Sequence, residues 1–139
     1  MKKIFSTIFP ALAWTILIQI ALCLPGEAIP STEGFPIPNF DKIVHVIIFG
    51  GFVGLWSYYL SRKTNYLKTL NTGLFLIYLL AVINGIAIEY IQRDYIPNRS
   101  FDQGDIIADV LSASIAYGIC NIVLGRRVSQ VFGGTKIGG

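Results

Sequence analysis

The sequence predicts an all-α fold: a polytopic membrane protein in which four transmembrane helices, joined by short loops, form a bundle. Hydrophobic residues make up 53% of the chain and charged residues 14%, whereas soluble domains carry roughly 25% charged residues. Four apolar runs approach the roughly 20 residues that a helix needs to cross a bilayer. The length of 139 residues fits a single domain, residues 1–139. This composition excludes a disordered chain, a small disulfide-rich secreted domain and a nucleic-acid-binding domain.

In chain order, we expect the spans at residues 4–24, 41–60, 68–92 and 105–124. The first ends before Pro25 and Gly26, two residues that disfavour helix. The second is polar only in its first turn, and the third is uncharged from Thr69 to Ile88. The fourth apolar run stops at Arg126 and Arg127.

The first apolar run also has the features of a secretory signal, because Lys2 and Lys3 precede it. Two details argue against cleavage. Leu22 stands where a lipoprotein cleavage box needs a small residue, and no A-x-A site follows. We favour a retained helix, and cleavage would leave the orientation of the other three spans unchanged.

The Lys and Arg residues predict the orientation of the spans, because short loops rich in them stay in the cytoplasm. Eight of the eleven fall in the N-terminal segment, the connector between the second and third spans, and the tail. They are Lys2, Lys3, Arg62, Lys63, Lys68, Arg126, Arg127 and Lys136. All eight acidic residues fall at the opposite ends of the spans or in the loops there. We therefore expect both termini in the cytoplasm.

Ionisable residues inside or beside the spans are the candidate functional residues, because a membrane disfavours them unless they have partners. Asp41 and His45 share one face of the second span, since residues four apart in a helix project from the same side. The third span ends with Glu89 and Gln92, and Asp109 lies one turn after the start of the fourth. We expect one polar layer at the outer side of the membrane. Its candidate ligand-binding residues are Asp41, Lys42, His45, Glu89, Gln92, Arg99, Asp102, Asp105 and Asp109.

Structural roles also fit several of these residues. Asp41 and Asp105 stand where helices begin, and aspartate is a good N-cap. Lys42 fits a side chain that extends to the lipid headgroups, and His45 fits a hydrogen-bonded packing residue. Arg99 is the expected counter-ion of Glu89 or Asp105, in one coupled network with His45 beside it. Asp109 is too deep in its span for a simple cap.

The sequence predicts no metal site and no cofactor. It has a single histidine, no cysteine close to it and no H-E-x-x-H run. Nucleophilic catalysis would need a Ser or Cys beside the histidine, and Ser100 is the sole candidate neighbour.

Four motifs of this chain resemble the VanZ-like family of membrane proteins. The family pattern is D-K-x-x-H opening one helix, E-x-x-Q ending the next, then R-S/x-x-D and D-x-x-x-N. The matching segments are Asp41–His45, Glu89–Gln92, Pro97–Asp102 and Asp105–Asp109, in a stretch from Asp41 to Gly118. Asp109 stands where the family usually has Asn, and Ser112 where it usually has Gly.

The resemblance implies a four-helix protein of the bacterial cytoplasmic membrane, in a family named for low-level resistance to teicoplanin. The leading hypothesis is a non-enzymatic envelope protein whose outward-facing pocket binds a lipid headgroup, a lipid-linked cell-wall precursor or a glycopeptide. In this hypothesis Arg99 and Lys42 contact anionic groups, and Glu89, Asp105 and Asp109 hold the basic side chains in place.

Two alternatives remain open. One is a membrane enzyme that acts on a lipid-linked phosphate or sugar, with His45 as general acid or base and Glu89 or Asp105 orienting it. The other is a structural subunit of an oligomer or larger membrane assembly, in which the polar layer is only an ion-pair lock.

Overall fold

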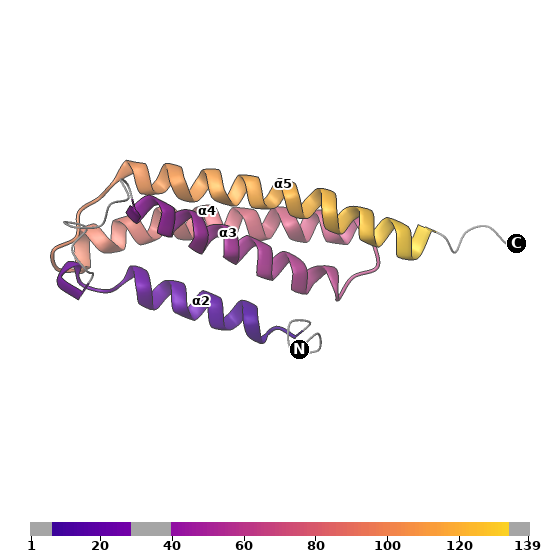
Figure 1. Cartoon of the computed structure of the whole chain (residues 1–139), viewed down its shortest axis with the longest axis horizontal. Coiled ribbons are helices and arrows are strands. Elements are labelled where there is room, and N and C mark those ends of the chain that lie inside the picture. The colour runs from indigo at the N-terminus through magenta and orange to yellow at the C-terminus, as the bar shows by residue number, and fades with distance from the viewer. Residues whose placement is uncertain (1–6, 29–39, 134–139) are drawn as a thin grey trace, which may run out of the picture.

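The protein is an up-and-down bundle of α-helices, seen in a computed structural model that describes residues 7–28 and 40–133. These residues form α2 (Phe9–Leu22), α3 (Phe40–Ser61), α4 (Leu67–Tyr95) and α5 (Gln103–Gly133), with a short 3₁₀ turn, η1 (Gly26–Ala28), after α2. Three of these helices, α3, α4 and α5, are long and apolar enough to cross a membrane. The predicted all-α bundle is confirmed for this part of the chain (Figure 1).

The first predicted span corresponds to a shorter helix than expected. α2 has 14 residues, which at about 1.5 Å per residue is about 21 Å, less than the roughly 30 Å of a hydrocarbon core. Pro10 lies in its first turn, where the missing N–H costs nothing. Pro25 soon follows its end. Residues 4–6 of the predicted span lie outside the described residues, so the prediction of a fourth crossing helix is not tested.

The other predicted boundaries hold to within a few residues, with one exception. α5 begins at Gln103 and continues to Gly133, nine residues beyond the expected end at Leu124. Arg126 and Arg127 end the apolar run, but arginine is a good helix former. The helix therefore continues to Gly133, the last described residue.

Two apolar clusters form the core. One joins all four helices around Phe49, Ile18 and Ile88, and the other joins α4 and α5 around Leu70, Leu74 and Leu124. α2 packs mainly on α3. The indole N–H of Trp14 donates to the Ile48 carbonyl (3.0 Å). The Trp14 ring also lies directly over Gly51, where an added Cβ would come within 2.8 Å of it.

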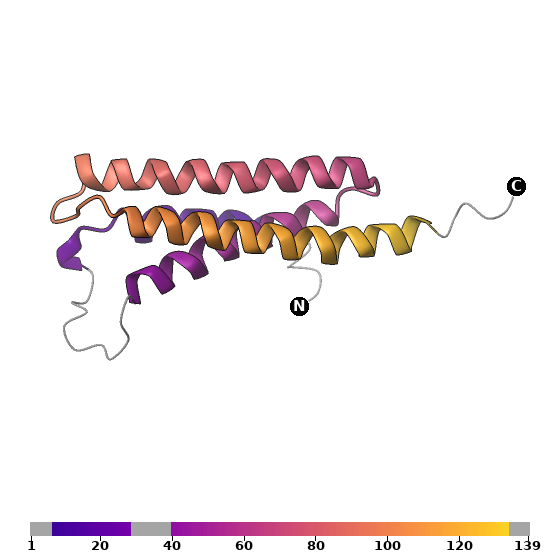
Figure 2. The ribbon, with the colours of Figure 1, turned by 90° about the horizontal axis from the view of Figure 1, so that it is seen from above.

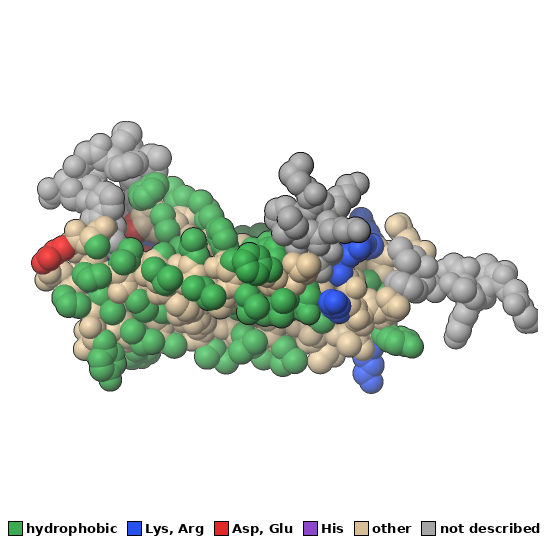
Figure 3. All heavy atoms as spheres, turned by 90° about the horizontal axis from the view of Figure 1, so that it is seen from below, with side chains coloured by type: hydrophobic (Ala, Val, Ile, Leu, Met, Phe, Trp, Pro, Cys, Tyr) green, Lys and Arg blue, Asp and Glu red, His purple; other side chains and the backbone are tan. Residues whose placement is uncertain are grey.

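Charged side chains divide between the two ends of the bundle. The end of α3, the start of α4 and the last part of α5 lie at one end of the bundle, here called the basic end (Figure 1). These segments carry Arg62, Lys63, Lys68, Arg126 and Arg127. Figure 3 shows Lys and Arg side chains gathered there and acidic side chains at the opposite end, called the acidic end. The predicted separation of charge thus holds in the described part of the chain. Cytoplasmic termini stay a prediction.

α5 lies between α3 and α4 at the acidic end. Seen from above, α3 and α4 separate there, and the start of α5 runs between them (Figure 2). α3 accordingly packs more extensively on α5 than on α4. This arrangement places side chains of α5 within reach of both neighbours, and it positions the site described below.

Candidate functional site

Three helices and one loop bring seven ionisable residues together at the acidic end. The group, called the acidic-end cluster below, consists of Asp41, Lys42 and His45 from the start of α3, Glu89 from α4, Asp102 from the loop before α5, and Asp105 and Asp109 from the start of α5. The predicted polar layer is therefore present as one connected set of side chains.

The shallow half of the cluster is centred on Lys42. Its ammonium donates to Asp102 Oδ2 (2.8 Å), Asp105 Oδ1 (3.1 Å) and Asp41 Oδ2 (3.2 Å). About half of the Asp41 and Asp102 side chains is exposed, 50% and 47% respectively. Lys42 therefore does not extend away to the headgroups, as its position in the sequence suggested. It is the cation that joins α3 to the start of α5.

Asp102 caps α5, a role that the sequence suggested for Asp105. Its Oδ1 accepts the backbone N–H of Gly104 (2.6 Å), which is the usual N-cap bond. α5 begins two residues earlier than expected, so Asp105 falls inside the first turn and its carboxylate is free to accept from Lys42. The hydrogen bond from Lys42, reinforced by that from Gly104, holds the pKa of Asp102 below its ordinary value of 3.8.

The deep half of the cluster surrounds His45, which is 4% exposed. His45 Nδ1 lies 2.9 Å from Asp109 Oδ1. An ionised carboxylate can only accept, so Nδ1 carries the hydrogen. The other ring nitrogen, Nε2, faces Asp105 Oδ2 at 3.7 Å, too far for a hydrogen bond. Asp109, rather than Glu89 or Asp105, is thus the residue that orients the imidazole.

Glu89 joins the deep half to the loop. Its side chain is fully buried, and its Oε2 accepts the backbone N–H of Asp102 (2.9 Å). The end of the loop after α4 therefore contacts the cluster through the Asp102 amide. Two buried carboxylate oxygens, Glu89 Oε1 and Asp109 Oδ2, have no hydrogen-bond partner among the described residues.

Two predicted site residues lie apart from this network. Arg99 forms no ion pair or hydrogen bond with any residue in the described ranges, and its Nε is buried without a partner. The prediction that Arg99 neutralises Glu89 or Asp105 is therefore wrong. Lys42 is the cation that pairs with Asp105. Gln92 is buried and donates to the Leu22 carbonyl (2.7 Å), so it anchors the end of α2 to α4.

One residue of the site was missed by sequence reasoning. Gly85 packs against Asp109, and a Cβ added to it would lie 2.8 Å from Asp109 Oδ2. The sequence does hold an indication of this role: Gly85 precedes Glu89 by four residues and therefore lies on the same face of α4. A glycine in a long apolar helix carries no other mark of function.

The cluster contains more acidic than basic side chains. Its five carboxylates, when ionised, face one ammonium and one imidazole, so the sum is −4 with a neutral imidazole and −3 with a protonated one. Unpaired charge inside or beside a membrane is costly. Additional positive charge, from a ligand, a metal ion or bound protons, would stabilise this arrangement.

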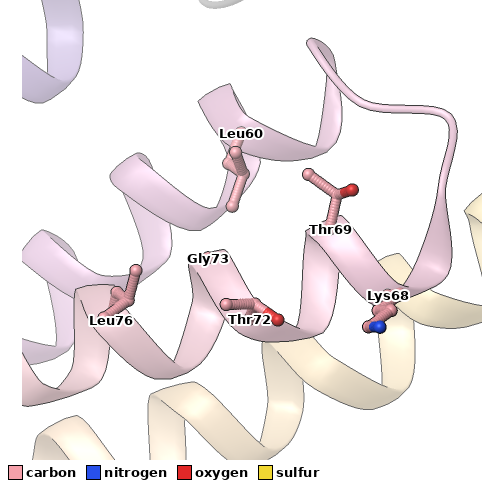
Figure 4. A pocket seen from close by; sticks show the side chains of 6 residues that line it. All are labelled: Leu60, Lys68, Thr69, Thr72, Gly73 and Leu76. Carbon is pink, nitrogen blue, oxygen red and sulfur yellow. The ribbon is translucent and has the colours of Figure 1, made fainter.

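Two grooves lie away from the cluster. One, of about 400 Å³, is at the basic end, where Leu60 of α3 faces Thr69 and Gly73 of α4 and Lys68 lies at the rim (Figure 4). The other, of about 680 Å³, follows the apolar face of α2 from Phe9 to Leu24. Neither holds a group of titratable side chains.

Comparison with known proteins gives one similarity of low identity. An uncharacterized protein of Schizosaccharomyces pombe is 29% identical over 115 residues. The match covers 81% of this chain but 65% of the yeast protein, so the chain spans less than two thirds of its relative. No protein-family model matches the chain, and no solved structure matches it. The resemblance to VanZ-like proteins accordingly stays a hypothesis.

Proposed function

We propose that this chain is a small integral membrane protein of the bacterial cell envelope whose acidic-end cluster binds the headgroup of a membrane lipid or lipid-linked cell-wall precursor. Glycopeptide resistance, the property that the VanZ-like resemblance implies, would follow from that binding. The observation that carries the proposal is a cluster of five carboxylates with one ammonium and one imidazole, whose shallow half, at Asp41 and Asp102, is half-exposed.

The charges favour a zwitterionic headgroup that carries an amine and a phosphate. The amine would lie beside Asp41 and Asp102, whose carboxylates share a single ammonium with Asp105. Lys42 is saturated by these three carboxylates and has little capacity left for an anion. Arg99, without an ion pair in the described ranges, is the cation that would bind the phosphate, since its guanidinium matches phosphate geometry.

Lipid retention tests this proposal. The full chain is purified in mild detergent, and native mass spectrometry compares its retention of added phosphatidylethanolamine and phosphatidylglycerol. We expect wild type to retain phosphatidylethanolamine more strongly, because only this lipid offers an amine to the carboxylates. Arg99→Gln should weaken retention about 10- to 150-fold, since a hydrogen bond to a charged group contributes about 1.5–3 kcal/mol.

Arg93→Gln is the matched control. Arg93 lies in the last turn of α4, and it already pairs with Asp94 (2.6 Å) in an exposed salt bridge. The same substitution there should leave lipid retention unchanged. Equal retention by both variants, or no retention of either lipid by wild type, would contradict the proposal.

A second function is supported by the pair formed by His45 and Asp109. A carboxylate that accepts from one imidazole nitrogen leaves the other as a base, which is the arrangement of a general acid or base. The substrate would be a lipid-linked phosphate or sugar, and His45 Nε2 would move the proton. Hydrolysis of such a lipid by wild type, lost in His45→Gln at unchanged lipid retention, would favour the enzyme over a binding protein.

A further inference from the structure

The deep half of the acidic-end cluster has the donor set of a divalent metal centre. His45, Glu89 and Asp105 each offer one ligand atom, and these atoms lie within 4.8 Å of one another. All three residues are buried. They come from α3, α4 and α5 respectively, so no spacing within a single helix could reveal them. The sequence predicts no metal site, because it has a single histidine, no cysteine close to it and no H-E-x-x-H run.

Each of these three side chains is held in place through its other polar atom. Asp109 holds His45 at Nδ1 (2.9 Å), Lys42 holds Asp105 at Oδ1 (3.1 Å), and the Asp102 amide holds Glu89 at Oε2 (2.9 Å). The remaining atoms are His45 Nε2, Asp105 Oδ2 and Glu89 Oε1. A histidine whose second ring nitrogen donates to a carboxylate is the usual outer-shell arrangement of a metal ligand.

The buried Glu89 carboxylate gives independent support for a ligand. The side chain is fully buried, and Oε1 has no partner among the described residues. Leaving a buried acceptor unpaired costs about 1–3 kcal/mol, and more for a charged group. The other carboxylate trio of the cluster, Asp41, Asp102 and Asp105, already surrounds the Lys42 ammonium. In the described part of the chain, Lys42 contacts only Asp105 of the deep trio, and no cation contacts Glu89.

The distances are compatible with a first-row divalent cation. Zinc lies about 2.0–2.2 Å from imidazole nitrogen and carboxylate oxygen, so ligand atoms around a tetrahedral ion are about 3.3–3.6 Å apart. His45 Nε2 and Asp105 Oδ2 are already 3.7 Å apart. The widest separation within the trio, up to 4.8 Å, requires a closure of about 1.5 Å at most.

We propose that His45, Glu89 and Asp105 bind a divalent transition-metal cation of the zinc class through Nε2 and one oxygen of each carboxylate. Three protein ligands leave at least one coordination position open for water or an oxyanion. The cation lowers the negative charge of the cluster by two. This site does not depend on headgroup binding, since every ligand lies below the half-exposed carboxylates of the shallow half.

Cobalt serves as the probe because, unlike zinc, it absorbs visible light when it binds nitrogen and oxygen ligands. The full chain is purified in detergent, treated with a chelator and titrated with CoCl₂. Elemental analysis after zinc addition measures the stoichiometry. We expect one cation per wild-type chain, with visible cobalt bands. His45→Gln and Glu89→Gln should abolish the bands, and Asp109→Asn should weaken cobalt affinity about 10–100-fold.

Asp41→Asn is the control, because it removes a carboxylate of the shallow half and none of the three ligands. It should bind cobalt as wild type does. The wild-type titration needs no variant to fold, so it is decisive by itself. Absence of stoichiometric metal from the wild-type chain would overturn the proposal, and so would bands that persist in both glutamine variants. A water molecule or a proton would then satisfy Glu89 Oε1. A positive titration without any lipid retention would contradict the headgroup proposal alone.

Discussion

The substitution Gly85→Ala tests whether Gly85 is required for the close contact between α4 and α5 at the site. The new Cβ would lie 2.8 Å from Asp109 Oδ2, 3.1 Å from Asp109 Cβ and 3.3 Å from Asp109 Cγ. Asp109 is 1% exposed, and His45 holds its other oxygen at 2.9 Å. It therefore cannot yield without loss of that hydrogen bond.

The magnitude follows from comparison with a second glycine. Overpacking of this kind costs about 1–3 kcal/mol. Alanine also gains up to about 1 kcal/mol of helix propensity over glycine. Gly118→Ala receives the same gain without the cost, because nothing lies within 4 Å of a Cβ at that position of α5. Gly85→Ala should therefore be about 1–3 kcal/mol less stable than Gly118→Ala.

Thermal unfolding of the detergent-solubilised chain measures this difference. The loss of helical circular dichroism on heating reports unfolding without added labels. A loss of 1 kcal/mol lowers the midpoint by about 4 °C in a chain of this size. Adding Asp109→Ala to Gly85→Ala should remove most of the steric cost. Equal midpoints for the two glycine variants would refute the reasoning.

Three further predictions concern the same end of the bundle. Lys42→Met should lower the unfolding midpoint by the equivalent of about 1–3 kcal/mol, because it removes three hydrogen bonds to carboxylates. Arg99→Gln, which breaks no ion pair in the described ranges, should change stability by less than about 0.5 kcal/mol. Similar losses in the two variants would contradict the assignment of Lys42 as the paired cation. Gln92→Ala should free the Leu22 carbonyl, cost about 1–2 kcal/mol, and speed proteolysis after α2; an unchanged cleavage rate would argue against the anchor. The folded-state pKa of Asp102 lies below its ordinary 3.8, so the stability that its ionised carboxylate contributes is present above pH 3.8 and is lost as the pH falls further. Acid should therefore destabilise Asp102→Asn less than wild type. Curves of stability against pH that run parallel for the two proteins would contradict this.

Helix positions and the composition of the polar layer could be predicted from the sequence. The lengths of the apolar runs predict the positions of α3 and α4 to within a few residues. The four-residue spacing of Asp41 and His45 places both side chains on one face of α3. The continuation of α5 past Arg126 could not be predicted from hydropathy. Hydropathy reports where the apolar environment ends, whereas the helix continues past Arg126 and Arg127 to Gly133, the last described residue.

The pairing within the layer could not be predicted, because it depends on how the helices separate. Lys42 and Arg99 both belong to the acidic end, and nothing in the chain order decides which reaches Asp105. The separation of α3 from α4 places the start of α5 between them, which gives Lys42 the contact. The cap at Asp102 was missed for a related reason. α5 begins two residues earlier than expected, so Asp102 becomes the N-cap and Asp105 lies inside the first turn.

The central claim is that the acidic-end cluster binds a ligand and does more than hold three helices together. The most direct measurement compares teicoplanin resistance and protein abundance in cells of a sensitive bacterium that express wild type, His45→Ala or Asn121→Ala. Asn121 lies on α5 well beyond the cluster, toward the basic end. We predict that wild type and Asn121→Ala raise resistance, while His45→Ala fails to do so at equal abundance. A loss of resistance matched by a loss of protein would favour the ion-pair lock of a structural subunit. Full resistance in His45→Ala at normal abundance would contradict the claim.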